Sequence, residues 1–193
     1  MQSARSSSPG FTLIELMVTV AVFTILAVIA IPSFIELRER MALRGASDQL
    51  VSFWANAKME AVKRHTSLAI TIRKSGTTMC MGATATLTGC NCFTANACEI
   101  DQYPADQADW RGVTMVGNPT LGADDTDDIG LAIVDPKRGY LDTATDVGGA
   151  TLVSSQNRYR TKLYVDRWAR PMLCAPTDSP KILSELADRT CAP

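Results

Sequence analysis

The most constraining feature of this 193-residue chain is an apolar segment close to its N-terminus. No charged residue lies between Leu16 and Ile31, and the only polar residues there are Thr19 and Thr24, whose hydroxyls can bond back to the helix. With its flanks the segment reaches about 20 residues, the length that crosses a bilayer as a helix. We therefore expect residues 11–35 to span a membrane.

Glu15 lies four places inside this apolar run, which begins at Phe11. A charged side chain at the centre of a bilayer costs about 2.5–3.5 kcal/mol or more, so a carboxylate is rarely kept there without a partner. Glu15 is therefore the first candidate for a functional residue. The simpler alternative is a plain N-terminal anchor in which Glu15 snorkels to the surface or is protonated.

The start of the apolar run resembles the processing site of type IV prepilins and type II secretion pseudopilins, since it reads Gly10-Phe11-Thr12-Leu13-Ile14-Glu15-Leu16. The resemblance implies that residues 1–10 are a leader peptide, that prepilin peptidase cuts between Gly10 and Phe11, and that Phe11 becomes the N-methylated terminus. It also implies that the Glu15 carboxylate meets the terminal amine of a neighbouring subunit during assembly. Pro32 falls where pilins commonly carry a helix-kinking proline, and a proline inside a helix favours a bend on steric grounds as well.

The order of polar and apolar parts agrees with this resemblance. An ordinary secretory signal carries its cleavage site after the apolar core, whereas here the polar leader precedes the expected cut. Arg5 is the only charged side chain of the leader, and together with the amino terminus it biases the leader to the cytoplasmic side.

Helical periodicity continues in residues 36–65. Apolar residues recur there at three- and four-residue steps and form one stripe, made of Leu43, Ala46, Leu50, Phe53, Trp54, Ala57 and Ala61. We expect a single long helix from about Thr12 to Arg64, with a membrane-spanning half and an amphipathic half that packs on a globular head.

Residues 66–193 form the expected head, which is long enough for a core of its own. Runs rich in β-branched residues predict strands at Ser67–Arg73, Thr114–Val116, Gly130–Val134, Thr151–Ser154 and Thr161–Val165. Strands that follow one long helix predict an α+β fold with an antiparallel β-sheet against the helix. The resemblance implies the same architecture, a type IV pilin-like fold.

All six cysteines lie in the expected head, at Cys80, Cys90, Cys92, Cys98, Cys174 and Cys191. An even number of cysteines in an oxidising compartment predicts disulfides, although the sequence leaves their pairing open. Cys90 and Cys92 are too close for an easy mutual bridge, so each is expected to pair elsewhere. The alternative is a metal site that uses Cys90, Cys92 and Cys98, but their spacing is not that of a zinc finger.

Three further segments, in their order along the chain, resemble the FimT/FimU minor pilins and GspH-type pseudopilins. They are Trp54–Arg64, Asp109–Val113 and Thr161–Arg170. The first leads directly into an expected strand, the second precedes another, and the third closes the head with a basic segment.

The sequence gives little support for catalysis. His65 is the only histidine and lies at the expected helix-to-strand junction, where a solvated or capping role is the ordinary one. No Gly-rich phosphate loop and no Gly-x-Ser-x-Gly nucleophile motif occurs. The acidic run Asp124–Asp128 lacks the spacing of an EF-hand loop, so a solvated loop is favoured over a calcium site. We expect a non-enzyme without a cofactor or a metal.

A net charge of −1 gives no overall attraction to nucleic acid. Basic residues nevertheless crowd the last expected strand, at Arg158, Arg160, Lys162, Arg167 and Arg170. Some FimT-like minor pilins bind DNA through a C-terminal Gly-Arg-x-Arg motif, and this chain keeps only one of those arginines in its nearest match, Trp168-Ala169-Arg170-Pro171. The favoured alternative is a basic edge strand that discourages edge pairing.

These expectations converge on a minor pilin, a structural subunit that initiates or caps type IV pilus assembly. The alternatives are a GspH-type pseudopilin of a type II secretion system and a DNA-binding minor pilin for natural transformation. The implied partners are prepilin peptidase and other major and minor pilins, which contact the N-terminal helix. The implied location is the bacterial inner membrane, with the head in the periplasm, and then a pilus fibre or a periplasmic pseudopilus.

Overall fold

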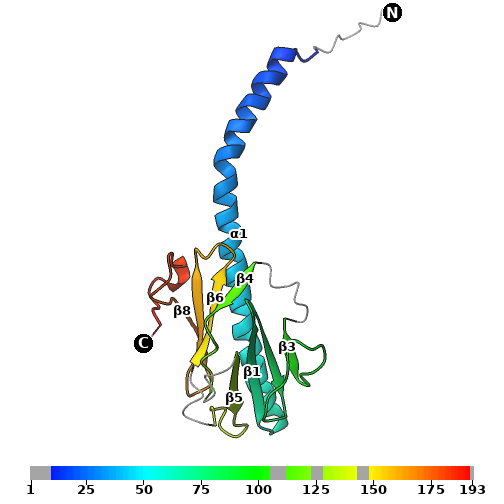
Figure 1. Ribbon diagram of the computed structural model, residues 1–193, viewed down its shortest axis with the longest axis vertical. Helices are drawn as coiled ribbons and strands as arrows, with labels where there is room; N and C mark the ends of the chain where they lie inside the picture. Colours follow the sequence, from blue (N-terminus) through cyan, green and yellow to red (C-terminus); the bar gives the residue numbers. More distant parts are fainter. Residues whose placement is uncertain (1–9, 105–111, 123–127, 143–147, 192–193) are drawn as a thin grey trace, which may run out of the picture. The chain divides into compact units, whose positions relative to one another are not determined.

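A computed structural model describes residues 10–104, 112–122, 128–142 and 148–191 of the chain (Figure 1). The chain divides into two compact units, one up to Arg38 and the other from Glu39 onward, and each is described by itself. A single helix, α1 (Leu13–Arg64), gives its N-terminal part to the first unit and its remainder to the second. The structure confirms the prediction of one long helix from about Thr12 to Arg64.

In the first unit α1 is apolar on all sides. Leu13 is 77% exposed, Phe23 is 73% exposed, and Pro32 lies inside the helix without ending it. Among the described residues, α1 is the one helix long and apolar enough to cross a membrane. A helix that is apolar all round needs lipid or other apolar helices about it.

The two threonines of the apolar run satisfy their hydroxyls within the helix, as predicted. The Thr19 hydroxyl donates to the Leu16 carbonyl at 2.8 Å, and the Thr24 hydroxyl donates to the Val20 carbonyl at 2.8 Å. Neither side chain therefore leaves an unpaired donor on the apolar surface.

In the second unit the predicted apolar stripe is the buried face of α1, and it shares one core with side chains from both β-sheets. The helix ends in a Schellman cap. His65 has a φ of 52°, and the N–H groups of His65 and Thr66 donate to the carbonyls of Val62 and Ala61 at 3.3 Å and 3.2 Å. The capping role considered for the only histidine is therefore the one that the structure shows.

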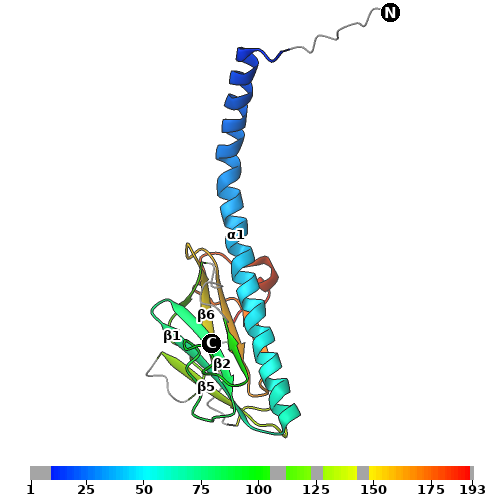
Figure 2. The same ribbon diagram turned by 90° about the vertical axis from the view of Figure 1, so that its right-hand side faces the viewer.

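The strands form two antiparallel sheets, which lie beside the part of α1 that belongs to the second unit (Figure 2). Sheet 1 has the order β3-β2-β1-β5 and consists of β1 (Leu68–Ser75), β2 (Thr78–Thr84), β3 (Asp101–Tyr103) and β5 (Ile129–Val134). Sheet 2 has the order β4-β6-β7-β8 and consists of β4 (Val113–Val116), β6 (Gly148–Ser154), β7 (Arg160–Val165) and β8 (Pro171–Cys174). A short 3-10 helix, η2 (Ser184–Leu186), follows near the C-terminus.

The α+β class is confirmed, but the single sheet of the prediction is two sheets. The sequence also did not predict β2, β3 and β8. In β2 every residue after Thr78 is buried, so this strand lacks the polar alternation that identifies a half-buried strand. The other two strands have only three and four residues, which is too short for a pattern.

The burial of β1 and β2 on both faces has a physical cause in the cysteine-rich loop of residues 85–100. Ile70 and Ile72 face the core with α1, whereas Thr71 lies on the opposite face, where its hydroxyl accepts the N–H of Cys90 at 3.2 Å. The loop is closed by the disulfides Cys80–Cys92 and Cys90–Cys98, which form a second buried cluster. Sheet 1 is therefore covered by α1 on one face and by cystines on the other.

The loop also explains one glycine of β2. A Cβ at Gly82 would collide with the Sγ atoms of Cys98 and Cys90, so only glycine allows the Cys90–Cys98 disulfide to pack on the strand. Cys90 and Cys92 have separate partners, as expected from their spacing. The third disulfide, Cys174–Cys191, joins β8 to the C-terminal segment.

Candidate functional site

The first part of the candidate site is the start of α1, where Thr12 and Glu15 cap the helix together. The N–H of Glu15 donates to Thr12 Oγ1 at 3.3 Å, and the N–H and the hydroxyl of Thr12 lie 3.5 Å and 3.4 Å from Glu15 Oε2. This arrangement is a capping box of the Thr-x-x-Glu type, which satisfies backbone donors that the first turn leaves free. Sequence reasoning considered the membrane cost of Glu15 and missed this local role, although the signature was readable.

The capping box fixes where the carboxylate lies. It holds Glu15 at the N-terminal end of α1, where the helix dipole favours a negative charge. Gly10 and Phe11 are exposed and precede the helix. A cut between them would create an amine at Phe11, one residue before the Thr12 N–H to which Glu15 bonds.

A second charged group that the sequence did not single out is Glu39, which is only 6% exposed. Its Oε1 accepts hydrogen bonds from Arg158 Nη2 at 3.2 Å and from the Ser155 hydroxyl at 3.4 Å, and its Oε2 accepts one from the Ser154 hydroxyl at 3.4 Å. The buried charge is therefore paired and hydrogen-bonded, as burial requires. It ties α1 to the turn between β6 and β7.

The five basic residues proposed for DNA binding are spread along β7 and beyond its two ends, with Lys162 inside the strand. Arg158 and Arg160 lie at the start of β7, where they pair with Glu39 and Asp178, while Arg167 and Arg170 follow its end. Arg170 pairs with Asp166 at 2.7 Å. The alternative explanation, a basic edge strand, is wrong for β7, because β7 lies between β6 and β8 and the edges of sheet 2 are β4 and β8.

The structure instead gathers a different basic and aromatic surface around the turn after β7. Trp168 is 50% exposed and meets the ring of Tyr140 edge-on, with the ring centroids 4.6 Å apart. Lys58 of α1 donates to the Trp168 carbonyl at 2.8 Å, and the N–H of Leu141 donates to the Arg167 carbonyl at 3.2 Å. We call Lys58, Tyr140, Arg167 and Trp168 the aromatic–basic surface. Its residues come from α1, from the turn after β5 and from the turn after β7, so the sequence analysis singled out Arg167 but not its neighbours in this surface.

Asp166 holds this turn in shape. Its Oδ1 accepts the N–H groups of Trp168 and Arg170 at 3.0 Å and 2.9 Å, and its Oδ2 accepts Arg170 Nε at 2.8 Å. Burial acts to raise the pKa of Asp166, but the hydrogen bonds from Arg170 and Trp168 outweigh it and hold the pKa below its ordinary value. The turn therefore depends on an ionised Asp166.

Within the described ranges no group of three or more His, Cys, Asp and Glu residues is arranged to hold a metal ion. His65 is exposed at the end of α1, away from any such group. Two sequence segments considered earlier lie wholly or mostly outside the described residues. They are Asp109–Val113, except for Gly112 and Val113, and Asp124–Asp128, except for Asp128.

Residues 5–31 match a family model described as the prokaryotic N-terminal methylation motif. No curated protein and no solved structure shows significant similarity to the chain. The match covers the expected cleavage site, Glu15 and most of the apolar run, and it leaves the second unit outside. Together with the apolar helix and the α+β architecture, it supports a structural subunit of the type IV pilin or pseudopilin type, anchored by its N-terminal helix.

Proposed function

We propose that this chain is a minor pilin of the FimT/FimU–GspH-like group, which helps to initiate or cap a type IV pilus after cleavage between Gly10 and Phe11. The proposal rests on one observation. The methylation motif lies on α1, and the part of α1 in the first unit exposes apolar side chains on all sides. Before assembly the bilayer covers these side chains. In a fibre the apolar helices of neighbouring pilins replace the lipid, and the head stays outside.

In this proposal Glu15 has two successive partners. In the isolated subunit it caps its own helix through Thr12. During assembly its carboxylate pairs with the methylated amine of Phe11 on a neighbouring subunit and so fixes the register between helices. The exchange is inexpensive because both partners are N–H donors at a helix start, and the ion pair is formed in a medium of low dielectric constant.

The capping box allows a sharper test than removal of the side chain alone. Glu15→Ala removes the cap and the charge, whereas Glu15→Gln keeps a side chain that can cap and removes only the charge. Thr12→Ala weakens the cap and keeps the charge. We expect all three variants to insert in the membrane fraction, and both Glu15 variants to be depleted from sheared fibres while Thr12→Ala is incorporated. Normal incorporation of Glu15→Gln would refute the charge pairing.

A deletion strain distinguishes the two assembly machines. Loss of surface pili in electron micrographs, with normal exoprotein secretion, is the result that a minor pilin predicts. Normal pili with lost secretion would assign the chain to a type II secretion pseudopilus. Because the two machines use the same leader and helix, the phenotype decides between them where the motif does not.

One observation favours a second candidate function, DNA capture for natural transformation. The aromatic–basic surface combines two exposed rings with the cations of Lys58 and Arg167, and no ion pair of Arg167 is found among the described residues. Aromatic rings stack on bases for about 1–3 kcal/mol each, and cations bind phosphates with a steep salt dependence.

The test of DNA capture is a titration of the full chain in detergent with single-stranded and duplex DNA at low and high salt. Trp168→Ala and Arg167→Glu should weaken binding, while Arg160→Gln at the other end of β7 serves as the control. No binding at low salt, or equal loss in the control, would eliminate this function.

A further inference from the structure

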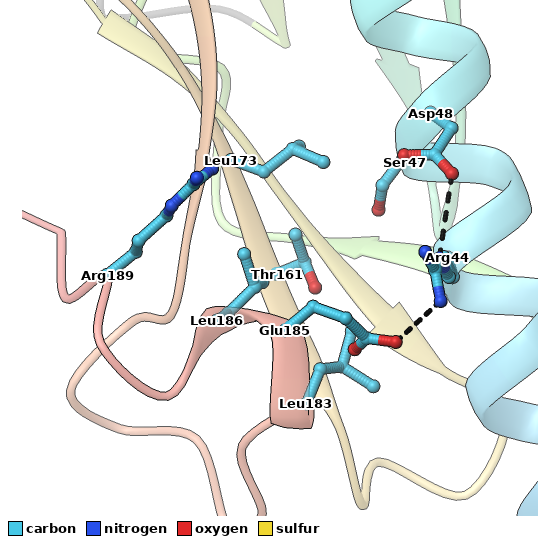
Figure 3. A pocket seen from close by; sticks show the side chains of 9 residues that line it. All are labelled: Arg44, Ser47, Asp48, Thr161, Leu173, Leu183, Glu185, Leu186 and Arg189. Carbon is cyan, nitrogen blue, oxygen red and sulfur yellow. Dashed lines mark hydrogen bonds and ion pairs between the residues drawn. The ribbon is translucent and has the colours of Figure 1, made fainter.

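A groove runs beside α1 along the open edge of sheet 2. It consists of two cavities, of about 230 Å³ and about 520 Å³, which share Asp48, Leu173 and Arg189 in their walls. The smaller one is shown in Figure 3, where the side chains of α1, β7, β8 and the segment around η2 surround it. The larger one continues past Val51 and Met172 and is mainly apolar. We call the two cavities together the β8 groove.

The backbone of β8 offers free hydrogen-bonding groups to this groove. The N–H of Asp166 donates to the Arg170 carbonyl, so the backbone groups of Arg170 point to β7. In an antiparallel ladder the backbone groups of every second residue point the same way, so those of Met172 and Cys174 also point to β7. Leu173 and Pro171 therefore turn their backbone groups to the open edge. Among the described residues no backbone bond outside the strand ladders involves Leu173. Its N–H and carbonyl, and the carbonyl of Pro171, are available.

The same edge already accepts an added strand from within the chain. Ala175 follows β8 and forms a parallel bridge with Thr190. The N–H of Ala175 donates to the Arg189 carbonyl at 2.7 Å, and the N–H of Cys191 donates to the Ala175 carbonyl at 3.1 Å. This pairing stops at Ala175, and the unpaired edge continues from there to Pro171. Strand addition is thus the mode of binding for which this edge is built.

Two polar groups in the walls give the groove a preference for its occupant. Thr161 of β7 is fully buried, and its Oγ1 has no hydrogen-bond partner. In Figure 3 this hydroxyl lies between α1 and η2, on the side of the cavity. A buried hydroxyl without a partner is costly. Arg189 is exposed, and among the described residues its guanidinium pairs with no carboxylate, whereas Arg44 across the groove is engaged by Glu185 at 2.6 Å. A carboxylate on the occupant would complement Arg189.

We propose that the β8 groove binds an extended peptide segment of a partner protein, which adds to the edge of sheet 2 at Leu173. The segment alternates apolar side chains, which fill the cavities, with polar ones that include a carboxylate for Arg189. The groove follows α1 from Arg44 to Val51, about 10 Å at 1.5 Å per residue, which matches three to four extended residues. This proposal concerns the second unit and stands apart from the assembly role of Glu15.

The probe is a fluorescent pentapeptide, fluorescein-Thr-Val-Asp-Val-Thr-amide, titrated by anisotropy against the full chain in detergent. The decisive controls are two N-methylated forms of the same peptide. One is methylated on the backbone nitrogens of the odd-numbered positions and the other on those of the even-numbered positions. An added strand bonds to the edge through every second residue. One of the two N-methylated peptides should therefore bind at least about tenfold more weakly than the unmethylated peptide, while the other should bind equally well.

Arg189→Glu tests the charge preference, with Lys63→Glu on the exposed end of α1 as the matched control. We expect Arg189→Glu to weaken the aspartate peptide about fivefold and to prefer the same peptide with lysine in place of aspartate. Unchanged thermal unfolding shows that the variant is folded, as expected for an exposed residue.

Three results would overturn the proposal. They are no binding up to about 1 mM peptide, equal binding by both N-methylated peptides, and self-association of the chain in sedimentation that added peptide reverses, which would make a second copy the occupant of this edge.

Discussion

The strongest quantitative prediction concerns the buried carboxylate of Glu39. Replacing it by alanine leaves Arg158 without its charged partner in the second unit. Breaking a buried ion pair from one side costs about 3–5 kcal/mol. Here Arg158 is 31% exposed and keeps a hydrogen bond from Nη2 to Gln156 Oε1 at 2.8 Å. Water and Gln156 therefore offset part of the loss, and we expect Glu39→Ala to lower the free energy of unfolding by about 2–3 kcal/mol.

The assay is thermal and urea-induced unfolding of the full chain in detergent, followed by tryptophan fluorescence. Trp54 is fully buried in the core of the second unit and reports its unfolding. For a domain of this size, a loss of about 2–3 kcal/mol lowers Tm by about 5–10 °C. Gln49→Ala, an exposed change on the same helix, should remain within about 0.5 kcal/mol of the wild type.

A double variant that removes both charges separates the ion pair from packing. Glu39→Leu combined with Arg158→Met replaces both charges by apolar groups of similar size, and such replacements are often neutral or stabilising. We expect the double variant to be more stable than Glu39→Ala by at least about 1 kcal/mol. The reasoning is refuted if Glu39→Ala lies within about 0.5 kcal/mol of the wild type, since the ion pair would then contribute no more than an exposed one.

Three further predictions concern single positions of the second unit. Gly82→Ala should prevent the Cys90–Cys98 disulfide from packing on β2, because its Cβ would collide with both sulfur atoms, and free thiols should become titratable. Gly45→Ala, in open space on α1, should instead stabilise by about 0.5–1 kcal/mol. His65→Gly should raise the free energy of unfolding by about 1 kcal/mol, because glycine adopts a φ of 52° without strain; an unchanged Tm would contradict this. The pKa of Asp166 is lower in the folded state, so its stabilising contribution is present above its ordinary pKa and is lost as pH falls through the folded-state value. In Asp166→Asn the urea midpoint should therefore depend less on pH across that acidic range. An unaltered pH dependence would count against the role of this carboxylate.

The sequence predicted those elements whose signal is local. The apolar stripe on α1 has a helical period over many turns, and its members are buried as expected. The strands β5 and β7 alternate between buried and half-buried residues, which is the pattern that identifies a strand with one covered face. β2 was missed because the cystine loop covers its second face, and a loop that covers a sheet leaves no periodic trace in the strand beneath it.

The candidate site divides in the same way. The capping box of Thr12 and Glu15 spans three residues and was within reach of sequence reasoning. The contact between Tyr140 and Trp168 joins turns that follow different strands of different sheets. The order of the strands decides this contact, and no short motif encodes it. Arg158 and Arg170 are close in sequence, but they lie beyond opposite ends of β7, and each pairs with its own carboxylate, Glu39 or Asp166.

The cystine cover of sheet 1 ties completion of the fold to chemistry outside the chain. Until Cys80, Cys90, Cys92 and Cys98 are oxidised, the loop of residues 85–100 is held on the sheet only by weak contacts such as the bond between Cys90 and Thr71. The core shared with α1 needs no such step. The chain can therefore complete one face of this sheet anywhere, and the other face only where an oxidant is present. The cystine layer on sheet 1 therefore forms only if the protein folds in an oxidising compartment.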